Sequence, residues 1–153
     1  MDDAYWMRRV LRLAEKGRGR TSPNPMVGAI LVKDSKVVGE GYHAKAGEAH
    51  AEIVAIRQAC QRLKTFQLED CDLYTSCEPC PMCLSAIYWA RLRNVFYGNT
   101  RKDAARIAFD DDFIYREVAL PIGKRKRKLR QVLHRQALAA FTEWERKADK
   151  VPY

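Results

Sequence analysis

The chain has 153 residues, of which 47% are hydrophobic and 31% charged, and its formal net charge is +9. This length and composition suit a soluble globular protein, so we expect residues 1–153 to form a single domain. No apolar run approaches the roughly 20 residues that a membrane-spanning helix needs. The N-terminal residues lack the small-residue cleavage site of a signal peptide, and we therefore expect a cytoplasmic protein.

The first half of the chain predicts two helices around a β-hairpin. Residues 1–17 are amphipathic and end in a glycine, as a surface helix often does. After a loop-forming stretch at 18–25, two apolar runs at 26–32 and 37–42 flank the sequence KDSK, which is typical of a hairpin turn. Apolar residues recur at helical spacing through 49–63, which predicts the second helix.

The middle of the chain predicts a strand–helix–strand unit. Residues 72–76 and 94–98 are short strand candidates. Between them, 81–92 predicts a helix that begins at Pro81, where the missing N–H costs little. A hairpin followed by such a unit implies a mixed sheet covered by helices, which is an α/β fold.

The last third of the chain is less regular. We expect an irregular stretch at 99–123 with a turn or two of helix, a fifth strand at 128–134 and a final helix at 136–150. The basic run 124–130 could form a nucleic-acid patch. We favour a solvated loop leading into an edge strand, because positive charges discourage edge aggregation and no aromatic residue interleaves this run.

Three of the five cysteines lie in the sequence CEPCPMC, from Cys77 to Cys83. The odd count and the expected cytoplasmic location argue against a disulfide framework and favour metal binding or chemistry. Cys80 and Cys83 are three residues apart at a helix start, so both thiolates can reach one metal ion, and zinc suits such ligands. The positive end of the helix dipole favours the ionised thiols there.

His50 supplies a third zinc ligand at the start of the helix predicted over 49–63. Three protein ligands leave a fourth position open, which is the catalytic pattern, because a water bound there becomes acidic near neutral pH. Ligand spacing alone leaves a second possibility open, since Cys77 as a fourth ligand would close a structural Cys3His site.

Glu52 favours the catalytic alternative. A solvated glutamate is common in the first turn of a helix. A hydrolytic site, however, needs a group that takes a proton from the activated water and delivers it to a leaving amine. H-x-E at 50–52 followed by P-C-x-x-C at 79–83 is the signature of zinc nucleobase deaminases. We therefore expect a zinc-dependent aminohydrolase with one Zn²⁺ per subunit, in which Cys77 is a packing or loop residue.

Two parts of the sequence resemble two families of this superfamily. From His50 onward, the chain resembles the bacterial guanine deaminases of the cytidine-deaminase-like superfamily over about two thirds of its length. The residues that carry this likeness are QLEDCDLYTSCEPCPMCLSAIYWAR, FDDDFIYREV and the ending KADKVPY. Residues 20–52 are similar instead to the pyrimidine deaminase domain of riboflavin biosynthesis, whose two cysteines are more widely separated than those here.

The resemblance implies a fold and a reaction. The fold is a cytidine-deaminase-like three-layer α/β/α sandwich with a central mixed five-stranded sheet. Both families replace the 2-amino group of a 2-amino-4-oxopyrimidine ring with oxygen, so we expect that reaction here, with conversion of guanine to xanthine and ammonia as the first choice. The alternatives are guanosine and a ribosylated 2-aminopyrimidine of the riboflavin pathway type.

The resemblance also implies a set of substrate contacts, some of them from the wider superfamily. These are Asn24, His43, Ala51, Trp89, Asp111 and Tyr153. The structural alternative for Asn24 and His43 is a turn or loop residue. For Trp89, Asp111 and Tyr153 the structural alternatives are, respectively, a core aromatic, a helix cap and a frayed tail. Val27 and His43 depart from the guanine deaminases, which carry an aromatic residue and an asparagine there, and both changes favour a bulkier substrate.

The resemblance further implies a homodimer that exchanges C-terminal segments, with Tyr153 closing the neighbour's pocket. The expected partner is a small-molecule purine or aminopyrimidine, with no nucleic acid and no membrane. One rival is a tRNA adenosine deaminase, which the +9 charge would suit, although a tail over the pocket would obstruct a flipped nucleotide. The other rival is a binding module that is not an enzyme and is stabilised by a structural zinc ion with Cys77 as its fourth ligand.

Overall fold

The computed structural model describes residues 1–109 and 111–151. The chain divides into two compact units, Met1–Arg116 and a second that begins at Glu117. The first unit contains the sheet. Among the helices of the described residues, none is both long enough and apolar enough to cross a lipid bilayer.

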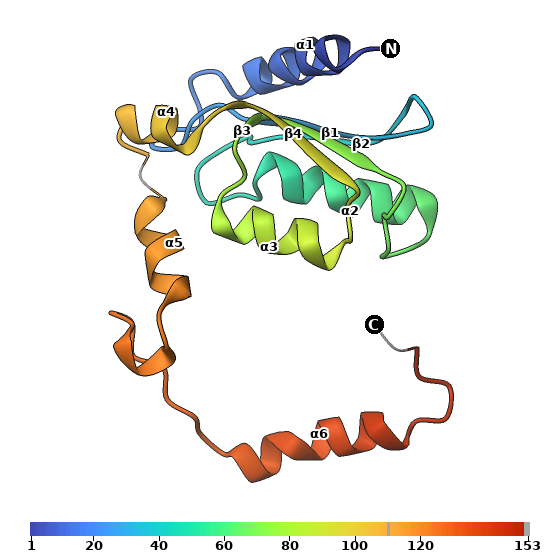
Figure 1. Ribbon diagram of the computed structural model, residues 1–153, viewed down its shortest axis with the longest axis vertical. Coiled ribbons are helices and arrows are strands. Elements are labelled where there is room, and N and C mark those ends of the chain that lie inside the picture. Colours follow the sequence, from blue (N-terminus) through green and yellow to red (C-terminus); the bar gives the residue numbers. More distant parts are fainter. Residues whose placement is uncertain (110, 152–153) are drawn as a thin grey trace. The chain divides into compact units, whose positions relative to one another are not determined.

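A mixed four-stranded sheet forms the centre of the first unit (Figure 1). Its strands are β1 (Gly28–Lys33), β2 (Lys36–Tyr42), β3 (Asp72–Cys77) and β4 (Asn94–Asn99), in the order β2-β1-β3-β4. β1 pairs antiparallel with both β2 and β3, whereas β3 and β4 are parallel. The mixed sheet expected from a hairpin followed by a strand–helix–strand unit is therefore confirmed.

The hairpin between β1 and β2 turns within the sequence KDSK, as the sequence predicts. Lys33 pairs with Lys36, and the residues between them, Asp34 and Ser35, have φ values of 49° and 57°. Two successive left-handed residues are the geometry of a type I′ turn, whose twist matches that of the flanking strands.

Helices cover both faces of the sheet. Helix α1 (Asp3–Ala14), followed by a short 3-10 turn at Glu15–Gly17, lies on one face, and α2 (Ala51–Leu63) and α3 (Pro81–Trp89) lie on the other (Figure 1). The three-layer α/β/α arrangement is thus present. The Asp2 side chain accepts a hydrogen bond from the amide of Tyr5 and so caps the start of α1.

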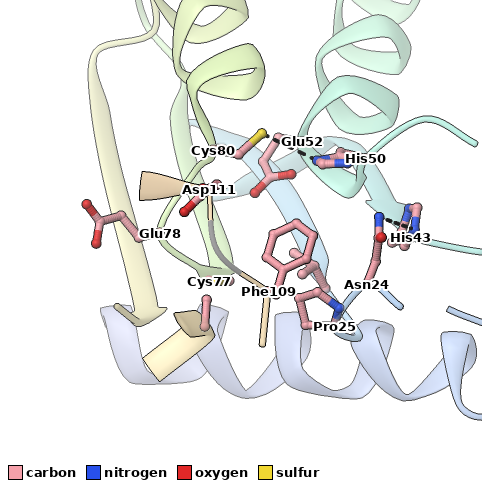
Figure 2. Close-up of a pocket in the computed structure, with 12 residues that line it drawn as sticks. Asn24, Pro25, His43, His50, Glu52, Cys77, Glu78, Cys80, Phe109 and Asp111 are labelled. Carbon is pink, nitrogen blue, oxygen red and sulfur yellow. Dashed lines mark hydrogen bonds between the residues drawn. The ribbon is translucent and has the colours of Figure 1, made fainter. Parts of the chain in front are cut away.

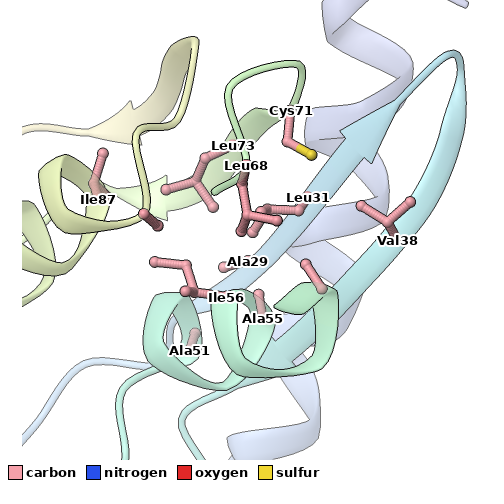
Figure 3. Close-up of a cluster of buried hydrophobic side chains, with 12 residues drawn as sticks. Ala29, Leu31, Val38, Ala51, Ala55, Ile56, Leu68, Cys71, Leu73 and Ile87 are labelled. Carbon is pink, nitrogen blue, oxygen red and sulfur yellow. The ribbon is translucent and has the colours of Figure 1, made fainter. Parts of the chain in front are cut away.

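Alternation along the strands divides the core into two layers, since successive side chains of a strand point to opposite faces. The larger layer lies between the sheet and helices α2 and α3 (Figure 3). Its buried members are Ala29, Leu31, Val38, Ala51, Ala55, Ile56, Ala59, Leu68, Cys71, Leu73, Ile87 and Ala90. The smaller layer joins the sheet to α1 and consists of Trp6, Val10, Leu13, Ile30, Val32 and Tyr74.

The prediction of a fifth strand at 128–134 is wrong. In the described residues the sheet has four strands, and α6 (His134–Arg146) begins where that strand was to end. The apolar residues of the segment, Leu129, Val132 and Leu133, are exposed and spaced by three and one, not by two. Without alternation, and with a basic run before it, the segment has no apolar face to place against a core.

The stretch expected to be irregular contains more helix than a turn or two. It forms α4 (Arg101–Arg106), α5 (Asp112–Ala119) and a 3-10 turn at Ile122–Lys124. A capping box starts α4, because Thr100 accepts a hydrogen bond from the amide of Asp103 while the Asp103 side chain accepts one from the amide of Thr100.

Replacement of Gly28 by alanine tests how closely α1 packs on the sheet. A Cβ at Gly28 would overlap the carbonyl oxygen of Val10 and come within 2.7 Å of the amide of Ala14. We expect Gly28→Ala to lower the free energy of unfolding by about 1–3 kcal/mol in urea titrations. Gly123→Ala, where an added Cβ meets nothing within 4 Å, is the control. Equal unfolding midpoints for the two variants would contradict this packing.

Candidate active site

The first turns of two helices converge at the carboxyl end of β3. His50 is the N-cap residue of α2, and Cys80 is the N-cap residue of α3. Pro81 follows at the first helical position, which suits its fixed φ and missing N–H, and Cys83 lies within the first turn. Both helix dipoles therefore direct their positive ends toward the same point, where they favour anionic ligands.

The geometry of this point fits a tetrahedral metal. The Nδ1 atom of His50 lies 3.5 Å from the Sγ atom of Cys80 and 3.5 Å from that of Cys83. With Zn–N bonds of about 2.0–2.1 Å and Zn–S bonds of about 2.3 Å, a tetrahedron has an N···S edge of about 3.6 Å. The ligand atoms of these three residues lie within 4.8 Å of one another, in the only such group among the described residues, and Cys77 is not part of it.

The two thiols of the group differ in how readily they ionise. A hydrogen bond from the Cys83 thiol, together with that of His50, lowers the pKa of Cys80 to about 4. The Cys80 thiolate in turn raises the pKa of Cys83, so that the two thiols by themselves share one proton. Zinc binding would release that proton. Burial raises the pKa of Cys77 to about 11, which keeps it a neutral thiol.

Glu52 is a buried carboxylate beside the ligand group. Its side chain comes from the first turn of α2 and is 3% exposed. The Thr75 hydroxyl donates to Oε1 at 2.9 Å, and Oε2 lies 3.4 Å from the Sγ atom of Cys83. Burial raises the pKa of Glu52. A carboxylate with a raised pKa, fixed through one oxygen, is equipped to take up and return a proton.

A pocket opens over these groups (Figure 2). Its lining residues are Asn24, Pro25, Val27, His43, His50, Glu52, Cys77, Glu78, Cys80, Ala104, Phe109 and Asp111. Six of the site residues expected from the sequence are among them. They are the proton carrier Glu52, the zinc ligands His50 and Cys80, and the substrate contacts Asn24, His43 and Asp111. All come from the first unit of the chain.

His43 and Asn24 form a hydrogen-bonded pair at one side of the pocket. His43 is 2% exposed, so it is not a solvated loop residue. Its Nε2 atom lies 3.1 Å from the Asn24 amide nitrogen, and its Nδ1 atom lies 3.3 Å from the carbonyl oxygen of Ala49. An imidazole protonated at Nδ1 satisfies both contacts, donating to Ala49 and accepting from Asn24. The Asn24 side chain also carries an amide oxygen, which is an acceptor that a ligand can use.

Asp111 lies at the other side of the pocket, directly before α5. It is 7% exposed, and burial raises its pKa, with a further contribution from the Cys80 thiolate. Figure 2 shows its carboxylate on the same side of the pocket as Cys80 and Glu78.

Two expected substrate contacts, Trp89 and Ala51, do not line the pocket. Trp89 ends α3 and is 62% exposed, and it is not among the lining residues. Ala51 is fully buried between His50 and Glu52 and belongs to the core. Tyr153 lies outside the described residues.

Two residues of the site escaped sequence reasoning. Phe109 places an aromatic ring in the pocket, which offers the stacking face that Val27 does not (Figure 2). Its position two residues before the expected substrate contact Asp111 is the feature of the sequence that could have indicated it. Thr75 is fully buried and holds Glu52. Its role could not be read from a strand sequence, because the partner lies 23 residues away in the chain.

The chain is similar over its whole length to a bacterial deaminase. It is 43% identical to the guanine deaminase of Bacillus subtilis (strain 168), a match that covers 100% of both chains. The X-ray structure of guanine deaminase from Bacillus subtilis superposes with a TM-score of 0.88 over 100% of this chain and 99% of the other, at 42% identity.

Further likenesses cover part of the chain. The riboflavin biosynthesis protein RibD of Escherichia coli (strain K12) is 44% identical over 101 residues, which are 62% of this chain and 26% of that protein. The structure of NE0047 in complex with 2,6-diaminopurine matches 69% of this chain and 60% of the other, at 27% identity and a TM-score of 0.59. The sequence model of the cytidine and deoxycytidylate deaminase zinc-binding region matches residues 1–99. The chain therefore belongs to the cytidine and deoxycytidylate deaminase zinc-binding family.

Proposed function

We propose that this protein is a zinc-dependent guanine deaminase, which converts guanine and water to xanthine and ammonia. The observation that carries the proposal is the end-to-end likeness to the Bacillus subtilis guanine deaminase, at 43% identity over both entire chains. The buried carboxylate of Glu52 beside a three-ligand group for zinc agrees with a hydrolytic role.

Zinc held by His50, Cys80 and Cys83 would supply a Lewis acid that makes a bound water acidic near neutral pH. The remaining steps belong to Glu52. Because Thr75 holds Oε1, the other carboxylate oxygen, Oε2, is the atom that takes the proton from the attacking water. It passes that proton to the ring nitrogen beside the 2-amino carbon. The second proton comes from the hydroxyl now on that carbon, and Glu52 transfers it to the amine as the C–N bond breaks and the new C=O bond forms.

The walls of the pocket suit a planar base with polar edges. Phe109 offers an aromatic face on which a purine can stack. Asp111 presents a carboxylate that can accept from ring N–H and amino groups, and Asn24 presents its amide oxygen at the opposite side. NE0047, a related protein, binds 2,6-diaminopurine, which has the same two-ring shape.

A ribosylated 2-aminopyrimidine is the second candidate substrate. The N-terminal two thirds of the chain are 44% identical to RibD of Escherichia coli over 101 residues. His43 and Val27 both line the pocket in this region, and they are the residues that depart from the guanine deaminase pattern. Guanine remains the first choice, because the RibD likeness covers 62% of the chain and the guanine deaminase likeness covers all of it.

The residues from Glu117 onward support a further proposal about assembly. Helix α6 has no buried residue, and its apolar side chains Leu138, Phe141 and Trp144 are exposed. An amphipathic helix with an exposed apolar stripe needs a partner surface. We propose that residues 1–153 act as one catalytic domain within a homodimer, with the C-terminal segment exchanged between subunits and Tyr153 at the neighbour's pocket. The cytoplasmic location expected from the sequence stays a prediction.

Removal of the proton carrier tests the proposed reaction. Glu52→Ala should retain zinc but lower the rate of ammonia release from guanine by at least about 100-fold, which is the usual scale for losing a general acid–base group. Glu48→Ala, an exposed glutamate close by in the sequence, is the matched control and should keep the wild-type rate. A wild-type protein that is folded and zinc-loaded but releases no ammonia from guanine would contradict the proposed substrate.

Metal analysis distinguishes the three-ligand site from a closed one. Cys80→Ala should lose most of its zinc, because two protein ligands bind the ion weakly, whereas Cys77→Ala should retain one zinc per chain. The measurement is zinc content by mass spectrometry after gel filtration. Loss of zinc in both variants would show that Cys77 completes a structural site instead.

Light scattering tests the dimer. The wild type at micromolar concentration should show twice the 17.7 kDa mass of one chain. Phe141→Glu, which places a charge in the exposed apolar stripe of α6, should shift the mass toward the monomer, whereas Gln136→Glu on the same helix should not. A monomeric wild type would rule out the exchange of segments.

A further inference from the structure

A chain of three contacts joins the zinc-ligand loop to the two helices that follow β4. The first contact is made by Glu78, two residues before the ligand Cys80. Its carboxylate accepts from the Arg101 backbone amide at 2.9 Å and from the Arg101 Nε atom at 3.0 Å. Arg101 is the first residue of α4, so Glu78 serves both as an ion-pair partner and as an anion at a helix N-terminus.

The second and third contacts involve Tyr115 of α5. The Arg101 guanidinium carbon lies 4.4 Å from the centre of the Tyr115 ring, which is a cation–π distance. The Tyr115 hydroxyl donates to the carbonyl oxygen of Pro79 at 2.6 Å. Burial raises the pKa of Tyr115 to about 12, so the hydroxyl keeps its proton throughout the neutral range. Pro79 directly precedes the zinc ligand Cys80.

These contacts end one helical turn away from Asp111. The amides of Ile114 and Tyr115 both donate to the carbonyl oxygen of Asp111, at 2.9 and 3.2 Å. Asp111 and Tyr115 therefore move together as the first turn of α5. The hydroxyl contact joins this turn to Pro79, the residue beside Cys80. The Asp111 carboxylate lies in the pocket (Figure 2).

We propose that Tyr115 is a positioning residue for Asp111, and that Glu78 and Arg101 hold Tyr115 in place. The inference rests on the proposed function, in which Asp111 binds the base. It assigns a task to a part of the chain that carries neither zinc nor the proton-carrying carboxylate. Since α5 has no buried residue, polar contacts such as that of the Tyr115 hydroxyl gain weight in placing its first turn.

The task has a kinetic signature. His50, Glu52 and Cys80 lie at the starts of α2 and α3, so the proposal predicts that loss of the Tyr115 hydroxyl leaves the chemistry at the metal unchanged. A displaced Asp111 would instead weaken binding of the base. Loss of the Tyr115 hydroxyl should therefore raise KM and leave kcat within about 2-fold, since removing one positioning hydrogen bond changes binding modestly.

A double-mutant cycle tests the proposal in the full-length, zinc-loaded protein. Tyr115→Phe should keep one zinc per chain and raise KM for guanine by about 3- to 10-fold. In an Asp111→Asn background the same substitution should change KM by less than about 2-fold, because the group that it positions has been lost. Arg101→Met should act in the same direction as Tyr115→Phe. The matched control is Tyr5→Phe, on α1.

Each result decides for or against the positioning role. Equal effects of Tyr115→Phe in both backgrounds, or no effect on KM at all, would overturn it. Loss of zinc in Tyr115→Phe would overturn it too, by showing that the contact supports the metal loop instead. A stability change alone, with KM unaltered, is the result expected of a residue that only supports the fold.

A measurement without guanine separates this proposal from the proposed function. Hydrogen exchange of the amides at 111–116 in the zinc-loaded protein should be faster in Tyr115→Phe than in the wild type, and unchanged in Tyr5→Phe. Faster exchange in a protein that does not deaminate guanine would leave the contact standing and reject only the substrate. Unchanged exchange would reject the positioning role whatever the substrate.

Discussion

The active site depends on the meeting of two helix N-termini. His50 and Cys80 are the N-cap residues of α2 and α3, so the backbone dipoles of both helices point at the metal position. Neither helix could hold that position by itself. The larger core layer between α2, α3 and the sheet fixes their separation, and the 3.5 Å distances from the His50 nitrogen to the two thiol sulfurs follow from it.

The same packing places a hydrogen-bond donor beside the buried carboxylate of Glu52. Glu52 sits in the first turn of α2, where burial disfavours its charged form. The Thr75 hydroxyl, from the neighbouring strand β3, satisfies one of its oxygens and leaves the other facing the metal group. A general acid–base group needs this balance, since a fully solvated carboxylate would hold its proton too weakly to return it. The sheet therefore contributes to the chemistry as well as to stability.

Sequence reasoning failed where local pattern and tertiary contact disagree. A fifth strand was expected at 128–134, yet the segment has no alternation and the described residues give it no sheet partner. The helices α4 and α5 were expected as irregular chain with a turn or two of helix. Their order comes from contacts such as the Thr100–Asp103 capping box and the link from Tyr115 to Pro79, the second of which joins residues 36 positions apart. Phe109 was missed although it lies two residues before Asp111 in the sequence, because only the tertiary structure shows that its ring lines the pocket.

The sequence by itself determined the elements of the sheet and the chemistry of the site. Hydrophobic periodicity located the hairpin and the strand–helix–strand unit, and the spacing of His50, Glu52, Cys80 and Cys83 identified a zinc hydrolase, because ligand type and spacing are local properties of the chain. Only the tertiary structure decided that Cys77 stands apart from the ligand group, that Thr75 holds Glu52, and that Phe109 and Asp111 share the pocket with Asn24. Those facts depend on distances between elements far apart in the sequence, which are set by core packing and not by any local pattern.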